Sequence, residues 1–241
     1  MNQTLDGRTV LVTGANGGLG EQFVAQAIER GAAKVYAATR RPRSWDDARV
    51  QSLSLDVTDA DDIARAVVAA PDVDLLINNA AIAPAGDSIA VPEDGLRQIF
   101  ETNFFGTLRV AADFAPVLAA NGGGTLLNVL SAASWFSVPT GYAASKAAMW
   151  SATNGLRVQL QGQGTQVTAL LVGMIDTPMS ARFDVPKVTA ADVVAQAYDG
   201  IADGLLEVLA DEPTRELKSR LSTRAEELYP WMGEQLATFV P

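Results

Sequence analysis

A tyrosine and a lysine four residues apart are the side chains best placed for proton chemistry in this sequence. Tyr142 and Lys146 stand in the segment YAASK, which opens a helical stretch, and residues four apart share one face of a helix. A phenol with an ordinary pKa of about 10 is a poor acid or base at neutral pH. Because a neighbouring ammonium favours the phenolate, we expect Lys146 to lower the pKa of Tyr142 into a useful range.

The composition limits which other chemistry the chain can perform. Its 241 residues include no His and no Cys, with 18 Lys and Arg against 28 Asp and Glu. These absences exclude Ser-His-Asp hydrolysis, thiol nucleophiles, disulfides and thiolate zinc sites, and we expect no metal site. Acid and base chemistry would then depend on Asp, Glu, Lys, Tyr or a cofactor. The net charge of −10 argues against nucleic-acid binding, because phosphate neutralisation needs a basic face.

The sequence carries no sign of membrane insertion or secretion. No apolar stretch approaches the length of a membrane span, and the N-terminal segment MNQTLDGRTVLVTG has no basic region followed by an apolar one. We therefore expect a soluble cytoplasmic protein that does not bind membranes.

A second candidate site is the glycine-rich segment TGANGGLG at residues 13–20, between an apolar strand pattern and a helix pattern. Its glycines allow a tight turn and a close approach of the backbone to a pyrophosphate at a helix N-terminus. The spacing G-x-x-x-G-x-G differs from the dinucleotide fingerprint G-x-G-x-x-G, and glycine turns also serve packing. The position after the first strand nevertheless favours dinucleotide binding, with contacts from Gly14, Asn16, Gly17, Gly18, Leu19 and Gly20.

Three arginines follow the second predicted strand, where a dinucleotide-binding protein selects the adenosine ribose. In VYAATRRPR, Arg40, Arg41 and Arg43 come after Thr39, at the place where NAD-preferring proteins usually present an acidic residue. Arginines there would hold a 2′-phosphate through charge-assisted bonds, although a solvated basic loop is the alternative. We expect NADP(H) to be the preferred cofactor, with Arg40 as its main contact beside Thr39 and Arg41. NAD(H) remains possible.

The elements that must position these residues follow a regular alternation. Short apolar runs predict strands at 9–13, 34–39, 51–55, 74–78, 124–131, 165–172 and 206–210. Amphipathic stretches predict helices at 18–30, 59–69, 92–120, 142–161 and 190–202, the second of them capped by Thr58. Runs that are apolar throughout indicate parallel strands covered on both faces.

This alternation implies repeated βαβ units and a doubly wound α/β fold. We expect residues 1–241 to form a single Rossmann domain, a parallel sheet of about seven strands with helices on both faces. Residues 211–241 would form a helical extension that packs on the edge of the sheet or on a partner subunit.

Taken together, these motifs resemble the short-chain dehydrogenase/reductase family over residues 7–210. Besides the glycine turn and YAASK, the resemblance rests on NNAA at 78–81, FETNFFG, NVLS and VGMIDTPM at 172–179. It implies that Tyr142 is the general acid or base and that Lys146 holds the nicotinamide ribose. It further implies that Ser131 hydrogen-bonds the substrate oxygen and that Asn103 orders a water linking Lys146 to solvent.

For the cofactor, the resemblance implies contacts at both ends of the molecule. Asp56 and Val57 would flank the adenine, and Ile175 and Thr177 would contact the nicotinamide carboxamide. Tyr142 and Lys146 would join the cofactor contacts, with the remainder from Asn79, Ala80, Ala81 and Gly173.

The sequence also departs from the family pattern. Ser131 and Tyr142 stand closer together than is usual, so Ser134 is a rival for the substrate contact. Family members more often have Gly where Ala81 stands, which would narrow the site slightly. They commonly have Pro where Val172 stands, a change that would only loosen the loop.

The segment after Thr177 is short, and its surroundings are apolar, which suggests a hydrophobic aldehyde or ketone as substrate. The expected substrate contacts, whose aromatic members could equally pack in the core or at an interface, are Ser131, Trp135, Phe136, Met174, Met179 and Phe183. The leading hypothesis is an NADPH-dependent carbonyl reductase, of the alcohol dehydrogenase type that acts on CH–OH groups. The alternatives are an NAD-dependent alcohol or hydroxysteroid dehydrogenase, and a non-catalytic dinucleotide-binding regulator. The resemblance also implies a homodimer or homotetramer.

Overall fold

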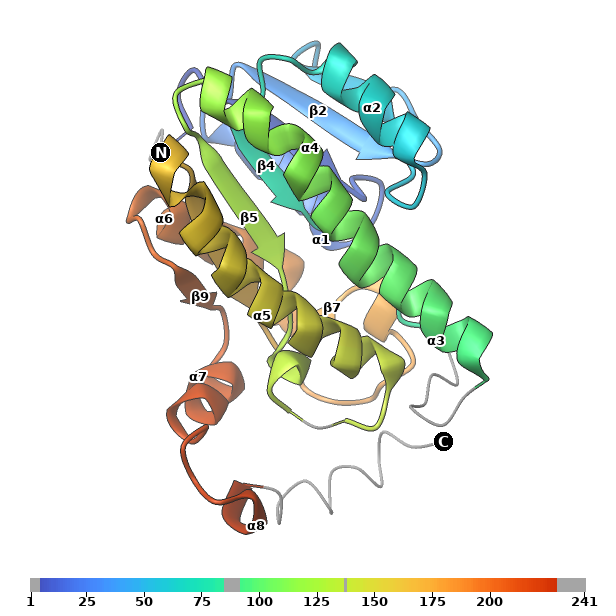
Figure 1. The fold of residues 1–241 in the computed structure, drawn as a ribbon, viewed down its shortest axis with the longest axis vertical. Coiled ribbons are helices and arrows are strands. Elements are labelled where there is room, and N and C mark those ends of the chain that lie inside the picture. The colour runs from blue at the N-terminus through green and yellow to red at the C-terminus, as the bar shows by residue number, and fades with distance from the viewer. Residues whose placement is uncertain (1–4, 85–91, 137, 229–241) are drawn as a thin grey trace.

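The structure, a computed structural model, describes residues 5–84, 92–136 and 138–228 (Figure 1). Its centre is a seven-stranded sheet in which every neighbouring pair is parallel, in the order β3-β2-β1-β4-β5-β6-β9. The strands are β1 (Thr9–Thr13), β2 (Lys34–Thr39), β3 (Val50–Ser54), β4 (Leu75–Asn78), β5 (Thr125–Val129), β6 (Gln166–Leu171) and β9 (Glu207–Leu209). The predicted doubly wound Rossmann fold is confirmed. The strand order reverses between β1 and β4, where such sheets form a crevice at the carboxyl ends of their strands.

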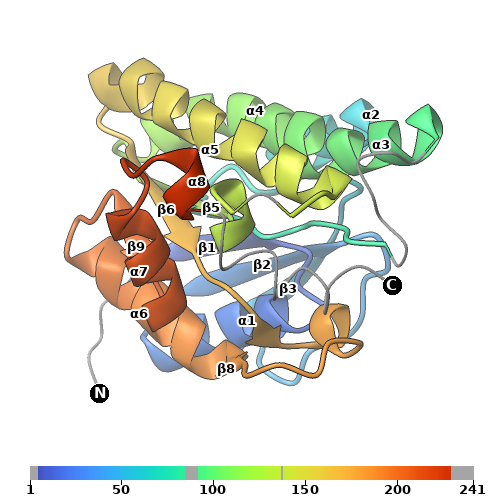
Figure 2. The ribbon, with the colours of Figure 1, turned by 90° about the horizontal axis from the view of Figure 1, so that it is seen from below.

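Helices cover both faces of the sheet (Figure 2). On one face, α1 (Leu19–Glu29) and α6 (Ala190–Ala202) bury their apolar sides together with inward side chains of β1 and β4, such as Val12 and Ile77. On the other face, α2 (Ala60–Ala69), α4 (Thr107–Ala120) and α5 (Gly141–Leu160) pack over the opposite side chains of the same strands, such as Leu11 and Leu76. Adjacent residues of a strand thus serve two cores, which explains why these strands are apolar throughout.

The long helix expected over 92–120 is three elements in succession. Helix α3 (Glu93–Phe100) passes into a π-helical turn, Glu101–Gly106, before α4 begins. Inside the turn, the side chain of Asn103 is buried. Its Oδ1 accepts the N–H of Ile82, and its Nδ2 donates to the carbonyl of Ile82. The hydroxyl of Thr107 donates to the Asn103 carbonyl at 3.1 Å. A π-turn adds one residue to a helix, often at functional sites, and here it allows Asn103 to point inward.

The helix over 60–69 begins differently from the prediction. Its N-cap is Asp59 and not Thr58, because Oδ1 of Asp59 accepts the backbone N–H groups of Asp61 and Asp62 at 2.8 and 3.0 Å. The hydroxyl of Thr58 instead donates to the carboxylate of Asp56 at 2.7 Å.

The C-terminal extension packs, as far as the structure describes it, on its own subunit. Helices α7 (Glu212–Ser219) and α8 (Ala225–Leu228) follow β9, and Leu217 and Leu228 are buried in the same core as α4 and α5. Residues 211–228 thus pack against the body of the domain, contact with a partner subunit stays a prediction, and the rest of the extension lies outside the described residues. A small parallel pair, β7 (Ile175–Asp176) and β8 (Val188–Thr189), stands apart from the main sheet. Within the described residues, no helix is long and apolar enough to cross a bilayer.

Candidate active site

A cleft of about 720 Å³ lies at the carboxyl ends of the central strands. It brings together most of the residues that the sequence singled out, from segments far apart in the chain. Of the predicted cofactor contacts it is lined by Gly14, Asn16, Gly17, Gly18, Leu19, Thr39, Arg40, Arg41, Asp56, Val57, Asn79, Ala80, Ala81, Tyr142, Lys146, Gly173, Ile175 and Thr177. Gly20 lies just behind this lining, at the start of α1.

The glycine turn adopts a backbone that other residues would strain. Gly14 and Gly18 have φ angles of 66° and 47°, in the left-handed region that favours glycine. A Cβ on Gly18 would also come within 3.0 Å of the Thr177 side chain, so this turn and the loop after β6 touch across the cleft. Gly17 is different, because a Cβ there would meet no atom within 4 Å. Its backbone therefore faces open space in the cleft.

Gly20 has a packing role that a substitution can measure. A Cβ on Gly20 would lie 2.2 Å from the carbonyl oxygen of Gly14. We expect Gly20→Ala to lower the free energy of unfolding by about 1–3 kcal/mol, the usual cost of overpacking, as measured by urea denaturation. Gly17→Ala is the matched control and should change stability by less than about 0.5 kcal/mol. Equal destabilisation by both variants would contradict this account of Gly20.

The glycine turn is fixed to the neighbouring strand by side-chain hydrogen bonds. The hydroxyl of Thr13 accepts the N–H groups of Asn79 and Ala80 at 3.0 and 3.1 Å. In return, Nδ2 of Asn79 donates to the carbonyls of Thr13 and Gly14 at 2.9 and 3.2 Å. Asn78, the preceding residue, reaches the opposite neighbour and donates to Asn128 of β5 at 3.0 Å. The NNAA segment thus holds β1, β4 and β5 in register at the floor of the cleft.

The three arginines after β2 have different surroundings. Arg43 pairs with Glu21 at 2.8 Å and stacks on the Trp45 ring at 4.1 Å. Arg40 and Arg41 are exposed, line the cleft and form no ion pair with any described residue. Two cationic side chains are therefore available at this end of the cleft, and the third is occupied elsewhere.

Asn16 connects the glycine turn to the arginines. Its Nδ2 donates to the hydroxyl of Thr39 and to the carbonyl of Arg41, at 3.1 and 2.6 Å. Its Oδ1 is buried in the cleft with no hydrogen-bond partner among the described residues. A buried acceptor of this kind is costly unless something donates to it, so it fits a ligand bound at this turn.

Tyr142, Ser131 and Lys146 converge at the other end of the cleft. Ser131 follows β5 and caps a short turn, Ala132–Ser134, while Tyr142 and Lys146 come from the first two turns of α5. The side chains of Ser131 and Tyr142 are hydrogen-bonded. The Nζ of Lys146 lies 5.6 Å from the centroid of the Tyr142 ring and donates to the carbonyl of Val129 at 2.7 Å. An acid, its hydroxyl partner and a buried cation thus stand side by side.

The acidities of these groups differ from the prediction. Burial raises the pKa of Tyr142, and the hydrogen bond with Ser131 offsets this only in part. Burial also lowers the pKa of Lys146 to about 8. The expected lowering of the Tyr142 pKa by Lys146 is therefore wrong for this structure, because the loss of solvation on burial is the largest influence on the phenol. Tyr142 is accordingly a protonated phenol at neutral pH, the form that can donate a proton.

Asn103 reaches this site from behind through Ser145. The Nδ2 of Asn103 donates to the hydroxyl of Ser145 at 3.1 Å, and that hydroxyl donates to the carbonyl of Tyr142 at 2.7 Å. Asn103 itself does not line the cleft, whereas its neighbour Thr102 does. The amide is thus connected to the helix turn that carries Tyr142 and Lys146.

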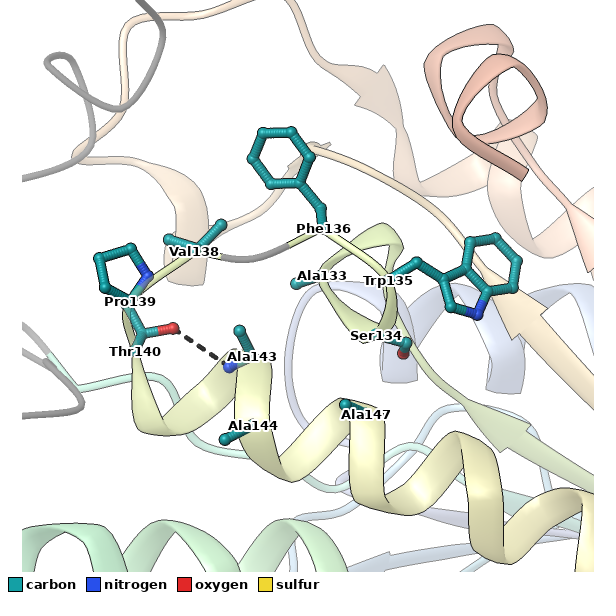
Figure 3. Close-up of a pocket in the computed structure, with 10 residues that line it drawn as sticks. All are labelled: Ala133, Ser134, Trp135, Phe136, Val138, Pro139, Thr140, Ala143, Ala144 and Ala147. Carbon is teal, nitrogen blue, oxygen red and sulfur yellow. Dashed lines mark hydrogen bonds between the residues drawn. The ribbon is translucent and has the colours of Figure 1, made fainter. Parts of the chain in front are cut away.

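The predicted substrate contacts divide into two groups. Ser131 and Met179 line the cleft, and Met179 is 43% exposed at its mouth. Ser134, the rival of Ser131, lines instead a separate hollow of about 320 Å³ beside the turn Ala132–Ser134, together with Trp135 and Phe136 (Figure 3). The rings of both aromatic residues point away from the alanines of α5 that form the floor of this hollow (Figure 3).

Trp135 is the clearest difference from the expected substrate pocket. Its indole is only 8% exposed and meets the Trp150 ring edge-on at a centroid distance of 5.8 Å. Met174 and Phe183 also stand outside the lining of the cleft, and Phe183 lies under the guanidinium of Arg182 at 4.7 Å. Placement in the cleft therefore favours Ser131 over Ser134, and Met179 over the other apolar candidates.

Comparison with known proteins agrees with this geometry. The protein family described as short chain dehydrogenase matches residues 8–186. The chain is 33% identical over 212 residues to 1-deoxy-11-beta-hydroxypentalenate dehydrogenase of Streptomyces exfoliatus, covering 81% of this chain and 77% of that protein. It is 35% identical over 193 residues to short-chain dehydrogenase PC-15 of Penicillium crustosum, covering 72% and 68% of the two chains.

The chain belongs to the short-chain dehydrogenase/reductase family. Among solved structures, a short chain dehydrogenase from Burkholderia cenocepacia in complex with NADP superposes with a TM-score of 0.88. The two are 34% identical, over 95% of this chain and 98% of the other. The family is one of oxidoreductases, so this short-chain dehydrogenase/reductase is an oxidoreductase with a Rossmann fold.

Several residues of this dehydrogenase/reductase site were missed from the sequence. Thr13 and Ser145 lie inside the quoted motifs, but their roles depend on partners from other segments, Asn79 and Asn103. The cleft is lined also by residues that continue recognised strands or loops, namely Leu55, Ile82, Thr102, Val129, Leu130, Val172 and Pro178. Most of these residues lie inside a quoted motif or directly beside one, and that position is the signal that could have found them.

Proposed function

We propose that the chain reduces a hydrophobic aldehyde or ketone to an alcohol by hydride transfer from NADPH. The observation that carries this proposal is the convergence of Ser131, Tyr142 and Lys146 in the same cleft as the glycine turn and the two available arginines. The cleft therefore offers a proton donor at one end and a place for a phosphate-rich dinucleotide at the other.

The residues of the cleft fit NADPH in three respects. The open space beside Gly17 admits a pyrophosphate near the N-terminus of α1, and Oδ1 of Asn16, which lacks a donor among the described residues, could accept a hydrogen bond from a ribose hydroxyl. Arg40 and Arg41 would hold the 2′-phosphate. Ile175 and Thr177 would hold the nicotinamide. The relative that was solved with NADP supports this choice over NAD, and when bound the nicotinamide would supply the hydride.

The protein's own residues would then supply the proton and the orientation. Tyr142 would donate its phenolic proton to the carbonyl oxygen of the substrate, which it can do because burial keeps it protonated. Ser131 would donate a hydrogen bond to the same oxygen. Lys146 would stabilise the phenolate left behind and hold the nicotinamide ribose, and Asn103 would order a water through which the proton returns from solvent.

The mouth of the cleft supports an apolar substrate. Ile82 and Met179 line the cleft, and the side chain of Met179 is exposed there. The same cleft contains Ser131 and Tyr142, the polar groups that would orient the carbonyl of the substrate.

The test is a panel of apolar aldehydes and ketones run with NADPH and with NADH. Turnover of at least one carbonyl with a preference for NADPH would support the proposal. Faster oxidation of alcohols with NAD would favour the alternative of an NAD-dependent alcohol or hydroxysteroid dehydrogenase. Tight cofactor binding without turnover of any alcohol or carbonyl would favour a non-catalytic regulator. Cytoplasmic location and assembly as a homodimer or homotetramer stay predictions.

The pKa of Lys146 predicts how reduction depends on pH. Because burial lowers that pKa to about 8, Lys146 keeps its positive charge below that pH and loses it above. Tyr142, whose pKa is raised, stays protonated throughout this range. We expect kcat/KM for reduction to be level at neutral pH and to fall as the pH rises past about 8, with the assay limited to conditions where the fold is intact. A rate that instead rises through this range would contradict the role of Lys146.

A further inference from the structure

The carboxylate of Asp211 links the C-terminal helix to the cleft. Asp211 follows β9 and is the N-cap of α7, where its Oδ1 accepts the N–H of Thr214 at 2.8 Å. Its Oδ2 accepts the N–H of Gly173 at 2.6 Å, and the residue is only 6% exposed. The two oxygens of one buried carboxylate thus bind two different segments. One binds the first turn of α7 (Figure 2), and the other binds the loop after β6.

The peptide between Val172 and Gly173 is held on both sides. Its N–H donates to Asp211, while its carbonyl accepts the N–H of Ala132 at 2.9 Å and the hydroxyl of Ser131 at 3.4 Å. Because a peptide unit is planar, fixing its N–H also fixes the direction of its carbonyl. Asp211 therefore sets the orientation of a group that contacts the turn beginning at Ser131.

The same peptide begins the segment that lines the nicotinamide end of the cleft. Ile175 and Thr177 follow Gly173 within four residues. A Cβ on Gly173 would lie 3.0 Å from Oδ2 of Asp211, so any other residue here would push the carboxylate away by a few tenths of an ångström. The close approach of Asp211 therefore favours glycine at position 173.

A second contact of α7 reaches the Ser131 turn from its other end. The Nζ of Lys218 lies 4.5 Å from the centroid of Trp135, the residue that closes this turn, and 2.7 Å from the carboxylate of Glu207. A cation over an indole face is attractive, and the ion pair holds it in place. Helix α7 and its N-cap therefore contact the Ser131 turn at Trp135 and, at Gly173, the nicotinamide segment, by which we mean residues 173–177.

We propose that Asp211 is a positioning residue for hydride transfer, acting through the Val172–Gly173 peptide on Ser131 and on the nicotinamide segment. This assigns the described part of the C-terminal extension a function in the reaction, and it rests on the proposed function above. Asp211 does not line the cleft, so it would act through the peptide and not by direct contact. We expect its effect to be confined to the nicotinamide half of the cleft, because the glycine turn is held by Asn79 and the backbone of Arg41 by Asn16.

The test is Asp211→Asn, which keeps the shape of the side chain. An amide has one acceptor oxygen, so it can cap α7 or accept from Gly173, but its NH2 group cannot replace the second bond. We expect kcat for reduction to fall about ten-fold and the Kd for NADPH to rise about ten-fold. The Kd for 2′-phospho-ADP-ribose, which lacks the nicotinamide, should stay unchanged.

The matched control is Asp59→Asn, the same exchange at the N-cap of α2. There both N–H groups donate to the single oxygen Oδ1, so the amide can keep both bonds, and we expect no change in kcat or in either Kd. If Asp211→Asn does not fold, Gly173→Ala tests the same contact, since its Cβ would lie 3.0 Å from Oδ2 of Asp211 and push the carboxylate away from the N–H of residue 173. It should show the same selective loss.

Two results would overturn the inference: an unchanged kcat in Asp211→Asn, or equal weakening of NADPH and of 2′-phospho-ADP-ribose. Equal weakening would show a general structural effect. A failure of the proposed function looks different, because the unmodified protein would then reduce no carbonyl with NADPH.

Discussion

Replacing Tyr142 by phenylalanine is expected to lower kcat for carbonyl reduction by about a thousand-fold, within the range of general acid catalysis. The substitution removes the phenolic hydroxyl beside Ser131 and Lys146 and leaves the ring in place. The chain has no His and no Cys to replace the lost acid, so a less well placed group, Lys146 or water, would have to supply the proton. The Kd for NADPH should change by less than about three-fold, because the glycine turn and the arginines are untouched. Single-turnover measurement of NADPH oxidation would separate the loss in the rate of the chemical step from any change in NADPH binding.

Tyr198→Phe is the control for losing a buried phenolic hydroxyl. Tyr198 is fully buried between α6 and α1, and its hydroxyl donates to the carbonyl of Phe23 at 2.7 Å. Its loss should lower the free energy of unfolding by about 1–3 kcal/mol without changing kcat. If Tyr142→Phe kept more than about a tenth of the activity, the proton would come from another group and the proposed acid would be wrong.

The fold could be predicted from the sequence because its signals are local and repeated. Apolar runs of five or six residues alternate with amphipathic stretches, and each strand buried on both faces shows this in its composition. The position of the glycine turn at the end of β1 then places it at the switch point of the sheet. Most of the predicted cofactor contacts consequently line one cleft.

What could not be predicted depends on contacts between distant segments. The π-turn at Asn103 is stabilised by the backbone of Ile82, and the N–H of Gly173 is held by a carboxylate 38 positions away. Trp135 turns away from the cleft because Trp150 and Lys218 provide a buried place for its indole. The pKa of Tyr142 was predicted in the wrong direction because a spacing of four residues reveals the cation but not the burial.

Replacing Arg40 by aspartate should reverse the cofactor preference. A charge-assisted bond to phosphate contributes about 1.5–3 kcal/mol, so removing it should raise the KM for NADPH by about ten- to a hundred-fold. The new carboxylate would repel the 2′-phosphate and could accept a hydrogen bond from the 2′-hydroxyl of NADH, whose KM should fall or stay level. Steady-state kinetics with both cofactors at one ionic strength would give the ratio of the KM for NADPH to the KM for NADH. Adding Arg41→Ala should increase the loss for NADPH.

Arg43→Ala separates a phosphate site from a generally basic loop. All three arginines carry the same charge within four positions, but Arg43 is held by Glu21 and Trp45 and is absent from the cleft lining. If local charge alone attracted the cofactor, losing Arg43 would cost as much as losing Arg40. We expect Arg43→Ala to leave the ratio of the KM for NADPH to the KM for NADH unchanged.

The exposure of Arg40 and Arg41 also predicts an effect of salt. Because both side chains are exposed, salt should weaken the preference for NADPH in the unmodified protein and have little effect in Arg40→Asp. Tighter binding of NADH than of NADPH by the unmodified chain would contradict the assignment. Tighter binding of NADH would leave Arg40 and Arg41, two positive charges in a protein of net charge −10, without a role in the cleft.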